Sequence, residues 1–317
     1  MSRGRWVLPG AGRITLGLLL IVPAAMTYPW RTASERWVLG IAVVVTIVLL
    51  SWWRGLPVTT ILWRRLALLS GRGHRARPTD ALTTVVLRVL PERDDELSPE
   101  LPLPLLAEYL DRYGIRCDAI RVTSRDTAAG RTTWIGLTLS AVANLAALQA
   151  RSADIALRDT AEIALRRLAD HLREYGWAIS TSDIDVPDLL GPDVAEKWRV
   201  VQDGTHGYVT AYGVASGAAL AEVLAAVWSS PSPELWTALE LTGVGDAVQV
   251  SVACAVRTGE VSDNAAPLPG LIAQRGRQRS ALAALHPLST EKLSAPTTSG
   301  QVLAELSWPA NRVPVRT

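Results

Sequence analysis

Two uncharged, apolar runs near the N-terminus limit what this chain can fold into. The first extends over residues 14–30 and the second over residues 37–53, and each holds 17 residues bounded by arginines. A helix of that length spans about 25 Å and, with apolar flanks, can cross a bilayer. A buried core helix is the weaker interpretation of the second run, because residues 41–50 have no polar face. We therefore predict a two-helix transmembrane hairpin over residues 1–55.

The first run also fits a second interpretation, a cleavable signal peptide. Arg3, Arg5 and Arg13 precede a short apolar core, and Pro23-Ala24-Ala25 is typical of the region around a cleavage site. Cleavage would leave the downstream part on the same side of the membrane, since the second run would still cross inward.

The distribution of arginine predicts the orientation of the hairpin. Three arginines precede the first run, two lie in the short connection, and six lie between residues 54 and 77. The positive-inside rule places both termini in the cytoplasm. Indole rings prefer the headgroup region and arginines reach lipid phosphates. The residues expected at the membrane interface are Trp30, Trp37, Trp52, Trp53, Arg54, Trp63, Arg64 and Arg65.

Residues 56–80 are predicted to form a basic juxtamembrane helix followed by a linker. Leu56 to Ser70 is amphipathic, and its apolar face would lie in the lipid interface. The same surface is equally typical of a helix that binds a partner protein. The linker that follows, residues 70–78, is rich in Arg, Gly and Pro.

The charge balance changes sign after this region. Residues 1–80 hold 11 Arg against Glu35 and Asp80, a net charge of +9, whereas residues 81–317 hold 21 basic and 28 acidic residues, a net charge of −7. An acidic cytoplasmic part lacks the electrostatic footprint of a nucleic-acid-binding protein. The cluster at Arg275, Arg277 and Arg279 is the exception, and such a cluster is more often a solvated loop than a binding patch.

The cytoplasmic part is predicted to be an α+β sandwich with its helices on one face of a mixed sheet. In a first subdomain, residues 81–190, apolar periodicity predicts strands at 82–90, 115–123, 131–139 and 177–180, with helices at 104–113 and 159–175. In a second, residues 191–260, it predicts a hairpin of 198–202 with 208–214, a mostly buried helix at 216–228, and strands at 235–242 and 247–257. Prolines predict an irregular C-terminal segment over residues 261–317.

A weak internal repeat raises the alternative of two half-domains. The step from Trp134-Ile135-Gly136-Leu137 into an Ala-rich helix resembles the step from Tyr208-Val209-Thr210-Ala211 into another.

Candidate catalytic groups are few. The chain has only two lysines, Lys197 and Lys292, neither in a Gly-Lys-Ser/Thr sequence, which excludes a P-loop ATPase. Cys117 and Cys254 lack the spacing of a zinc site and are predicted to be buried. Asp183-Ile184-Asp185 matches the D-x-D that holds a metal-bound nucleotide sugar in glycosyltransferases, although a loop of this composition usually forms Asx-turns.

The histidines give no stronger signal. His171 and Glu174 share a helix face and fit a surface pair, and His206, at a hairpin tip, becomes an acid or base only if carboxylates converge on it. We predict no catalytic, cofactor or metal site and no small-molecule substrate.

Several sequence blocks resemble the EccE family, a membrane component of the type VII (ESX) secretion system of mycobacteria and related actinobacteria. They are Trp52-Trp53-Arg54-Gly55, Trp63-Arg64-Arg65, Thr133 to Leu137, Asn144 to Arg151, Ala164 to Ala169, Gly176-Trp177 and the hairpin from Trp198 to Val214. The similarity covers most of residues 1–260.

This resemblance implies a non-catalytic structural subunit of the inner-membrane secretion complex. Its expected partners are EccB, EccC, an FtsK-like ATPase, and EccD, together with the lipid bilayer. The rival hypothesis is a membrane-anchored, glycosyltransferase-like enzyme that uses Asp183 and Asp185.

Overall fold

The computed structural model describes residues 52–53, 56–57, 81–90, 100–151, 156–182, 184–217, 219–260 and 266–309. The chain divides into two compact units, residues 1–73 and residues 74–317. The predicted spans, apart from Trp52 and Trp53, lie outside the described residues, as do Trp30, Trp37, Arg54, Trp63, Arg64 and Arg65. No helix of the described ranges is both long enough and apolar enough to cross a membrane.

In the first unit, a short hairpin stands where the sequence predicted helix. Strand β1 (Trp52–Trp53) pairs antiparallel with β2 (Leu56–Pro57), with Trp52 opposite Pro57. The prediction of a helix that ends at Trp53 and of another that begins at Leu56 is therefore wrong at these residues. Proline disfavours helical backbone at the residue before it and has no N–H to donate, which explains why Leu56 is extended.

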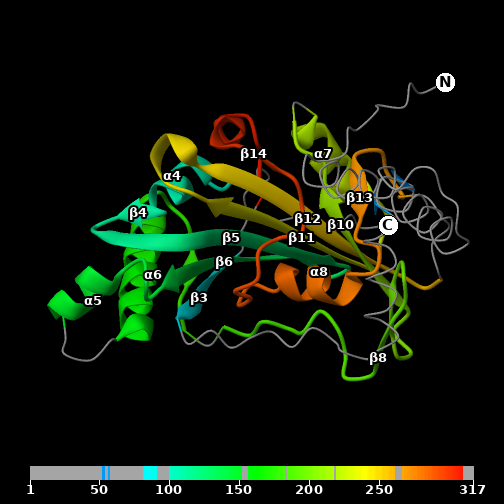
Figure 1. The fold of residues 1–317 in the computed structure, drawn as a ribbon, viewed down its shortest axis with the longest axis horizontal. Coiled ribbons are helices and arrows are strands. Elements are labelled where there is room, and N and C mark those ends of the chain that lie inside the picture. Colours follow the sequence, from blue (N-terminus) through cyan, green and yellow to red (C-terminus); the bar gives the residue numbers. More distant parts are fainter. Residues whose placement is uncertain are drawn as a thin grey trace, which may run out of the picture. The chain divides into compact units, whose positions relative to one another are not determined.

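The second unit is built on one antiparallel sheet (Figure 1). Its main strands follow one another across the sheet in the order β7 (Ile179–Ser180), β3 (Leu82–Val89), β6 (Gly130–Ser140), β5 (Ile115–Thr127), β11 (Glu234–Thr242), β12 (Gln249–Thr258), β10 (Tyr208–Val214), β9 (Val201–Asp203) and β8 (Val194–Glu196). At the margins, β4 (Asp111–Arg112) pairs with β5, β13 (Leu271–Ala273) with β10, and β14 (Thr297–Ser299) with β12. The predicted α+β class is confirmed.

The sheet contains the same topological unit twice. A strand, a helix and a hairpin follow one another as β3, α4 (Leu103–Glu108), β5 and β6, and again as β10, α7 (Leu220–Ser229), β11 and β12. In each unit the first strand pairs with the last, and the two units meet where β5 pairs with β11. By its place in the repeated unit, β10 corresponds to β3. The sequence comparison had matched Tyr208 to Ala211, on β10, with Trp134 to Leu137, on β6. That match is therefore wrong.

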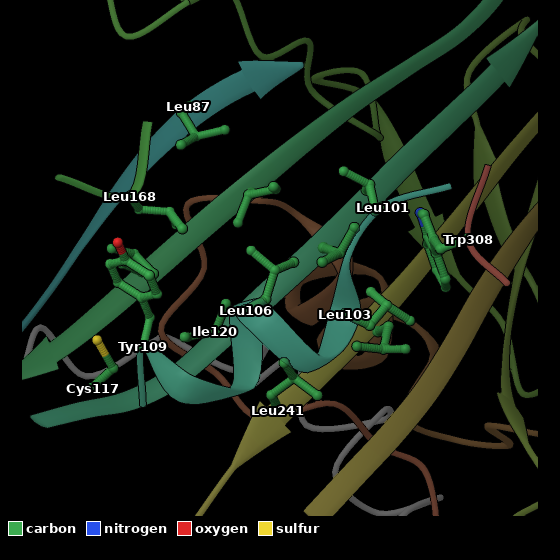
Figure 2. Close-up of a cluster of buried hydrophobic side chains, with 14 of the residues drawn as sticks. Leu87, Leu101, Leu103, Leu106, Tyr109, Cys117, Ile120, Leu168, Leu241 and Trp308 are labelled. Carbon is green, nitrogen blue, oxygen red and sulfur yellow. The ribbon is translucent and has the colours of Figure 1, made fainter. Parts of the chain in front are cut away.

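Side chains that alternate along the strands build two cores, one on each face of the sheet. On β11, Leu239 and Leu241 face one side while Trp236 and Ala238 face the other, the period of two that a strand imposes. The first core contains α4, α7, α5 (Leu145–Arg151) and α6 (Leu157–Glu174). Figure 2 shows part of it, where α4 residues such as Leu103 and Leu106 lie among strand side chains.

The second core contains a helix that the sequence analysis missed. Helix α8 (Gln278–Leu285) packs Ala281, Leu282 and Leu285 against the face opposite α6. The predictions of helices on one face only and of an irregular segment after residue 261 are therefore wrong. Pro267, Pro269, Pro287 and Pro296 all fall in connections between the elements of this segment, where proline is tolerated.

The other predicted helices differ from the observed ones in informative ways. Helix α6 is confirmed almost as predicted, with Asp159 in its first turn and Gly176 after its end at φ 88°. Helix α4 ends at Glu108, not Tyr113, because the chain turns back at Tyr113 and Gly114, both with positive φ. Helix α7 buries one stripe, whereas its alanines are exposed, so the prediction that it is mostly buried is wrong.

The remaining elements follow the predicted order with shifted ends. The hairpin of β9 with β10 is confirmed, but Trp198 lies in the turn between β8 and β9 instead of in a strand. Between β11 and β12, Gly243 has φ 91°, and a Cβ there would lie 2.3 Å from the Ala247 carbonyl oxygen. Only glycine fits this turn.

The end of the described chain is part of the first core. Trp308 has no exposed surface, packs edge-to-face on Trp228 at 5.2 Å between ring centroids, and donates its indole N–H to Ser124 Oγ at 3.0 Å. Arg131, paired with Asp126, also donates to the Pro309 carbonyl at 2.9 Å. The C-terminal segment therefore closes over the first core.

We expect Trp308→Ala to lower the free energy of unfolding of the fragment 74–317 by ~3–5 kcal/mol, because it leaves a cavity and removes the indole hydrogen bond to Ser124. Tyr175→Ala is the matched control, since this ring is 64% exposed, and should cost under about 1 kcal/mol. Urea unfolding followed by circular dichroism measures both. Equal losses for the two variants would contradict an anchoring role for Trp308.

Candidate functional site

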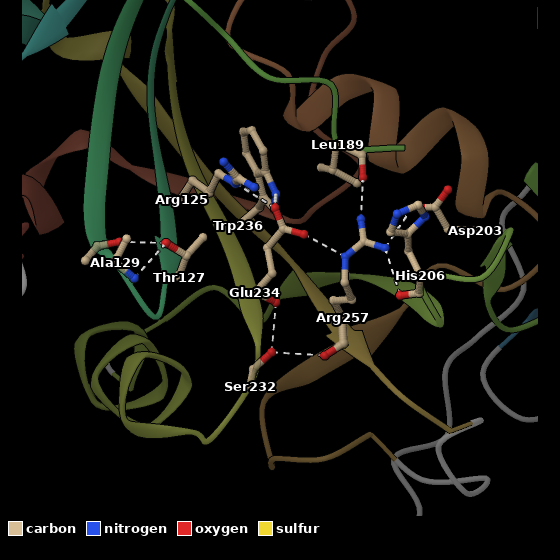
Figure 3. A network of polar contacts seen from close by, with 11 residues as sticks. Arg125, Thr127, Ala129, Leu189, Asp203, His206, Ser232, Glu234, Trp236 and Arg257 are labelled. Atoms are coloured by element: carbon tan, nitrogen blue, oxygen red, sulfur yellow. Dashed lines mark hydrogen bonds and ion pairs between the residues drawn. The ribbon is translucent and has the colours of Figure 1, made fainter. Parts of the chain in front are cut away.

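The main gathering of polar side chains lies where β11 begins and β12 ends, on the face of the sheet that α8 covers (Figure 3). Four residues form it: Arg125 on β5, Asp203 at the end of β9, Glu234 on β11 and Arg257 on β12. We call them the arginine network. The register of the strands brings them together, since Arg257 lies directly opposite Glu234 and Arg125 opposite Trp236.

Glu234 is the centre of the arginine network. Its Oε1 accepts hydrogen bonds from Arg125 Nε at 2.6 Å and from the Trp236 indole at 3.1 Å, and its Oε2 accepts one from Arg257 Nε at 2.6 Å. Burial alone would raise the pKa of Glu234, but the hydrogen bonds and charges of the two arginines outweigh it and hold that pKa below its ordinary value. Glu234 is therefore ionised and fully engaged.

Arg257 ties four parts of the chain to one guanidinium. Besides Glu234 it donates to Asp203 Oδ2 at 2.7 Å, to the Leu189 carbonyl at 2.9 Å and to the His206 carbonyl at 3.2 Å. Burial would lower the pKa of Arg257, but the hydrogen bonds that it donates to Asp203 and Glu234, with the charges of these carboxylates, raise that pKa above its ordinary value. The other oxygen of Asp203 accepts from the Gly191 N–H at 2.9 Å, so this carboxylate is satisfied too.

A cavity of about 650 Å³ opens beside the arginine network, lined also by Asp188, Pro192 and His206. Asp188, Asp203 and Glu234 line the same cavity as His206, so carboxylates are present around this candidate acid or base. Arg257 nevertheless binds both Asp203 and Glu234, which leaves neither carboxylate free to take or give a proton. The geometry fits a structural junction better than a proton-transfer site.

A second charged cluster lies at the seam where β5 meets β11. Arg121 and Glu240 stand directly opposite each other, form an ion pair, and are each only 3% exposed. Arg121 also donates to the Ser289 carbonyl at 2.8 Å, and Glu240 accepts from the Leu293 N–H at 3.2 Å. This pair fastens the segment after α8 to the centre of the sheet.

Of the two D-x-D residues, only Asp185 is described, and it belongs to neither cluster. Asp183 lies outside the described residues, and Asp185 is exposed on the connection between β7 and β8. Within the described ranges, no three His, Cys, Asp or Glu side chains are grouped as a metal site would require.

His171 and the cysteines are structural. His171 Nδ1 hydrogen bonds the Tyr109 hydroxyl at 3.1 Å and its ring packs on Tyr175, so its partners are aromatic, not Glu174 as predicted. Cys117 and Cys254 are buried as predicted, and burial raises the pKa of each thiol to about 12. Both are therefore protonated at neutral pH and unreactive.

Arg121, Glu240 and Arg257 were not among the predicted site residues. A signal was present for Glu240 and Arg257, which are charges in mostly apolar stretches of β11 and β12, whereas β5 carries several charges besides Arg121. Such a charge is rarely buried unless paired. The partners lie 119 residues apart for Arg121 and Glu240, so the sequence could not name them.

Comparison with known proteins decides the family. The chain is 48% identical over 284 residues to the ESX-3 secretion system protein EccE3 of Mycolicibacterium smegmatis, which covers 89% of each chain. It is 46% identical over 319 residues to the protein of the same name from Mycobacterium tuberculosis strain H37Rv, covering 97% of this chain and 96% of that one. The chain belongs to the EccE family.

The EccE family model, described as that of a type VII ESX secretion system translocon, matches residues 127–214. This stretch runs from the end of β5 through β6, α5 and α6 to the end of β10. It includes Asp203 of the arginine network, whereas Arg125, Glu234 and Arg257 fall outside it. The family model therefore covers only one of the four residues of the arginine network.

We expect Arg121→Leu to destabilise the fragment 74–317 by ~3–5 kcal/mol, because it leaves the Glu240 carboxylate buried without a cation. The double variant Arg121→Leu/Glu240→Leu should be less destabilised than the sum of the two single variants, by ~1–3 kcal/mol. Urea unfolding of the four proteins measures this coupling. Strict additivity would show that the two side chains do not act as a pair.

We expect the stability of the same fragment to decrease as the pH falls below 4.5, the ordinary pKa of a glutamate, through the lower pKa of folded Glu234. The folded state binds this proton less readily than the unfolded state, so its contribution is present above that range and is lost in acid. Glu234→Gln should cost ~1–3 kcal/mol near neutral pH and flatten this dependence. Glu222→Gln, on the exposed face of α7, is the control and should leave the pH profile unchanged.

Proposed function

We propose that this chain is a non-catalytic, structural subunit of a type VII secretion complex of the ESX-3 class. One observation carries the proposal: identity of 46–48% to EccE3 proteins over nearly the whole length of both chains. Similarity this extensive covers the predicted membrane region as well as the cytoplasmic domain. It favours a shared role for the whole molecule.

The chemistry of the described domain supports a structural role. The carboxylates of the arginine network and of the seam are held by arginines, and both cysteines carry thiols protected by burial. Groups in these states hold segments together and are not the free acids, bases or nucleophiles typical of an active site. Nothing in the described residues favours the glycosyltransferase alternative that would use Asp183 and Asp185.

The membrane arrangement is part of the proposal. Residues 1–55 form a two-span hairpin in the inner membrane, with Trp30, Trp37, Trp52, Trp53, Arg54, Trp63, Arg64 and Arg65 at the interface and both termini in the cytoplasm. Association with a secretion complex of the cell envelope fits the family, and the arginine distribution sets the orientation. The backbone at Trp52–Trp53 is extended, so in this proposal the helical part of the second span ends before Trp52.

The partners follow from the same assignment. We propose EccB, EccC and EccD as neighbours, with the ATPase EccC supplying the nucleotide hydrolysis that a chain without a P-loop lysine lacks. Helices in lipid associate through close packing, and Gly12, Gly17 and Gly40 allow such approach. Confinement to the membrane plane raises the effective concentration of the cytoplasmic domain near its partners.

Affinity purification tests this function. A tagged chain, expressed in Mycolicibacterium smegmatis without its own EccE3, should bring EccB, EccC and EccD out of detergent-solubilised membranes, as identified by mass spectrometry. The fragment 74–317 should recover them weakly, because it lacks the hairpin contacts and membrane confinement. A full chain that purifies without any secretion subunit would contradict the proposed function.

A matched control separates contact from tethering. Residues 1–55 are replaced by an unrelated two-span hairpin of the same orientation, which restores confinement but not the native helix faces. Full recovery of the partners by this chimera would locate all the binding in the cytoplasmic domain. Weak recovery would assign part of it to the native hairpin.

A further inference from the structure

Five cationic side chains gather at one corner of the acidic cytoplasmic domain. Lys197 and Arg199 lie in the turn between β8 and β9, and Arg275, Arg277 and Arg279 lie between β13 and the start of α8. We call these five residues the basic corner. They are half-buried or exposed, so their charged ends reach the surface.

Backbone contacts join the two segments into one surface. The Gly276 N–H donates to the Trp198 carbonyl at 2.8 Å, and the Arg279 N–H donates to Glu196 Oε1 at 3.2 Å. Buried Gln278 accepts from the Ala211 N–H at 2.7 Å, which fixes the start of α8 to the sheet. The basic corner is therefore a fixed arrangement and not a chance meeting of two loops.

The charges of the basic corner are less neutralised than those of α6. Three of the four exposed arginines of α6 pair with carboxylates, Arg158 and Arg166 with Glu162 and Arg173 with Asp170. Among the described residues, the side chains of Lys197, Arg199, Arg277 and Arg279 make no such ion pair; Arg277 instead donates to Ser294 Oγ at 2.6 Å. From the sequence, Arg275 to Arg279 was expected to be a solvated loop, because the sequence alone does not place Lys197 and Arg199 beside it.

Two further features favour an anionic ligand at this place. The start of α8 carries the positive end of a helix dipole, which favours anionic groups. One such group is already held there, since the Glu196 carboxylate accepts a hydrogen bond from the Arg279 N–H. Ile272, 44% exposed on β13, adds an apolar side chain at the margin of the cations. Cations with a flanking apolar residue are typical of surfaces that contact lipid headgroups.

We propose that the basic corner binds the anionic lipid headgroups of the cytoplasmic leaflet and so orients the domain against the membrane. The inference rests on the proposed membrane anchorage, which holds the domain close to that leaflet. Residues 81–317 carry a net charge of −7, so the leaflet repels the domain on average, and the basic corner opposes this repulsion locally. Complementary charge at one place, with net repulsion elsewhere, selects one orientation.

A fluorescent reporter in the full chain tests the proposal. Ala195→Cys, exposed on β8 next to the basic corner, is labelled with an environment-sensitive dye; the two native cysteines are buried and stay unlabelled. The chain is placed in nanodiscs of phosphatidylcholine alone or with an equal part of phosphatidylglycerol. We expect a blue shift of the emission only with phosphatidylglycerol, and its loss when salt rises from about 0.1 M to about 1 M, which screens the charges.

Two triple variants give the matched comparison. Arg275→Gln/Arg277→Gln/Arg279→Gln should abolish the shift, whereas Arg158→Gln/Arg166→Gln/Arg173→Gln, which removes the same charge from α6, should preserve it. Loss of the shift in both variants, an equal shift in neutral lipid, or a shift that requires added secretion subunits would overturn the lipid assignment; the last result would point to an acidic protein surface.

The same experiment separates this inference from its premise. A chain that stays with the nanodiscs but whose reporter ignores phosphatidylglycerol overturns lipid binding by the basic corner and leaves the anchorage standing. A chain that does not stay with the nanodiscs overturns the anchorage, and the orientation argument with it.

Discussion

The pairing of β5 with β11 is the interaction on which the rest of the domain depends. It joins the two strand–helix–hairpin units into one sheet, so that each core gains strands from both halves of the sequence. The ion pair of Arg121 with Glu240 lies on this seam, and Arg121 also hydrogen bonds the Ser289 carbonyl, which holds the C-terminal segment against the seam. A buried pair of this kind adds little stability over an apolar pair, but losing one member is costly. The seam therefore favours one register of the two halves.

The sequence predicted what local periodicity determines. Helix α6 and the strands β3, β6, β11 and β12 were found close to their observed limits, because each has a regular apolar stripe or alternation. Errors arose where a non-local contact decides the structure. Helix α8 is short and surrounded by prolines, and it is stable because Leu282 and Leu285 lie in the second core. Trp308 gives no local signal, yet it is fully buried through contacts with residues far along the chain.

The polar clusters show the same limit more sharply. Glu240 and Arg257 were visible as charges within mostly apolar stretches, but their partners lie far along the chain, so the sequence did not identify the pairs. Arg257 meets Asp203 across 54 residues and Glu234 across 23, and only the strand order brings them together. The basic corner was half-visible in the same way, since the Arg275–Arg279 cluster could be read and its neighbours at Lys197 and Arg199 could not. These pairs could not be predicted because their members lie far apart along the chain.

Interior and surface charges have different roles in this domain. In the interior of the described domain, arginines pair with carboxylates and fix segments that lie far apart in the sequence. At the basic corner, cations stand beside a helix start without carboxylate partners for most of them, on a domain that is acidic overall. A rigid body with one attractive corner can be held in a defined orientation at a charged surface, whereas a flexible or uniformly charged one cannot.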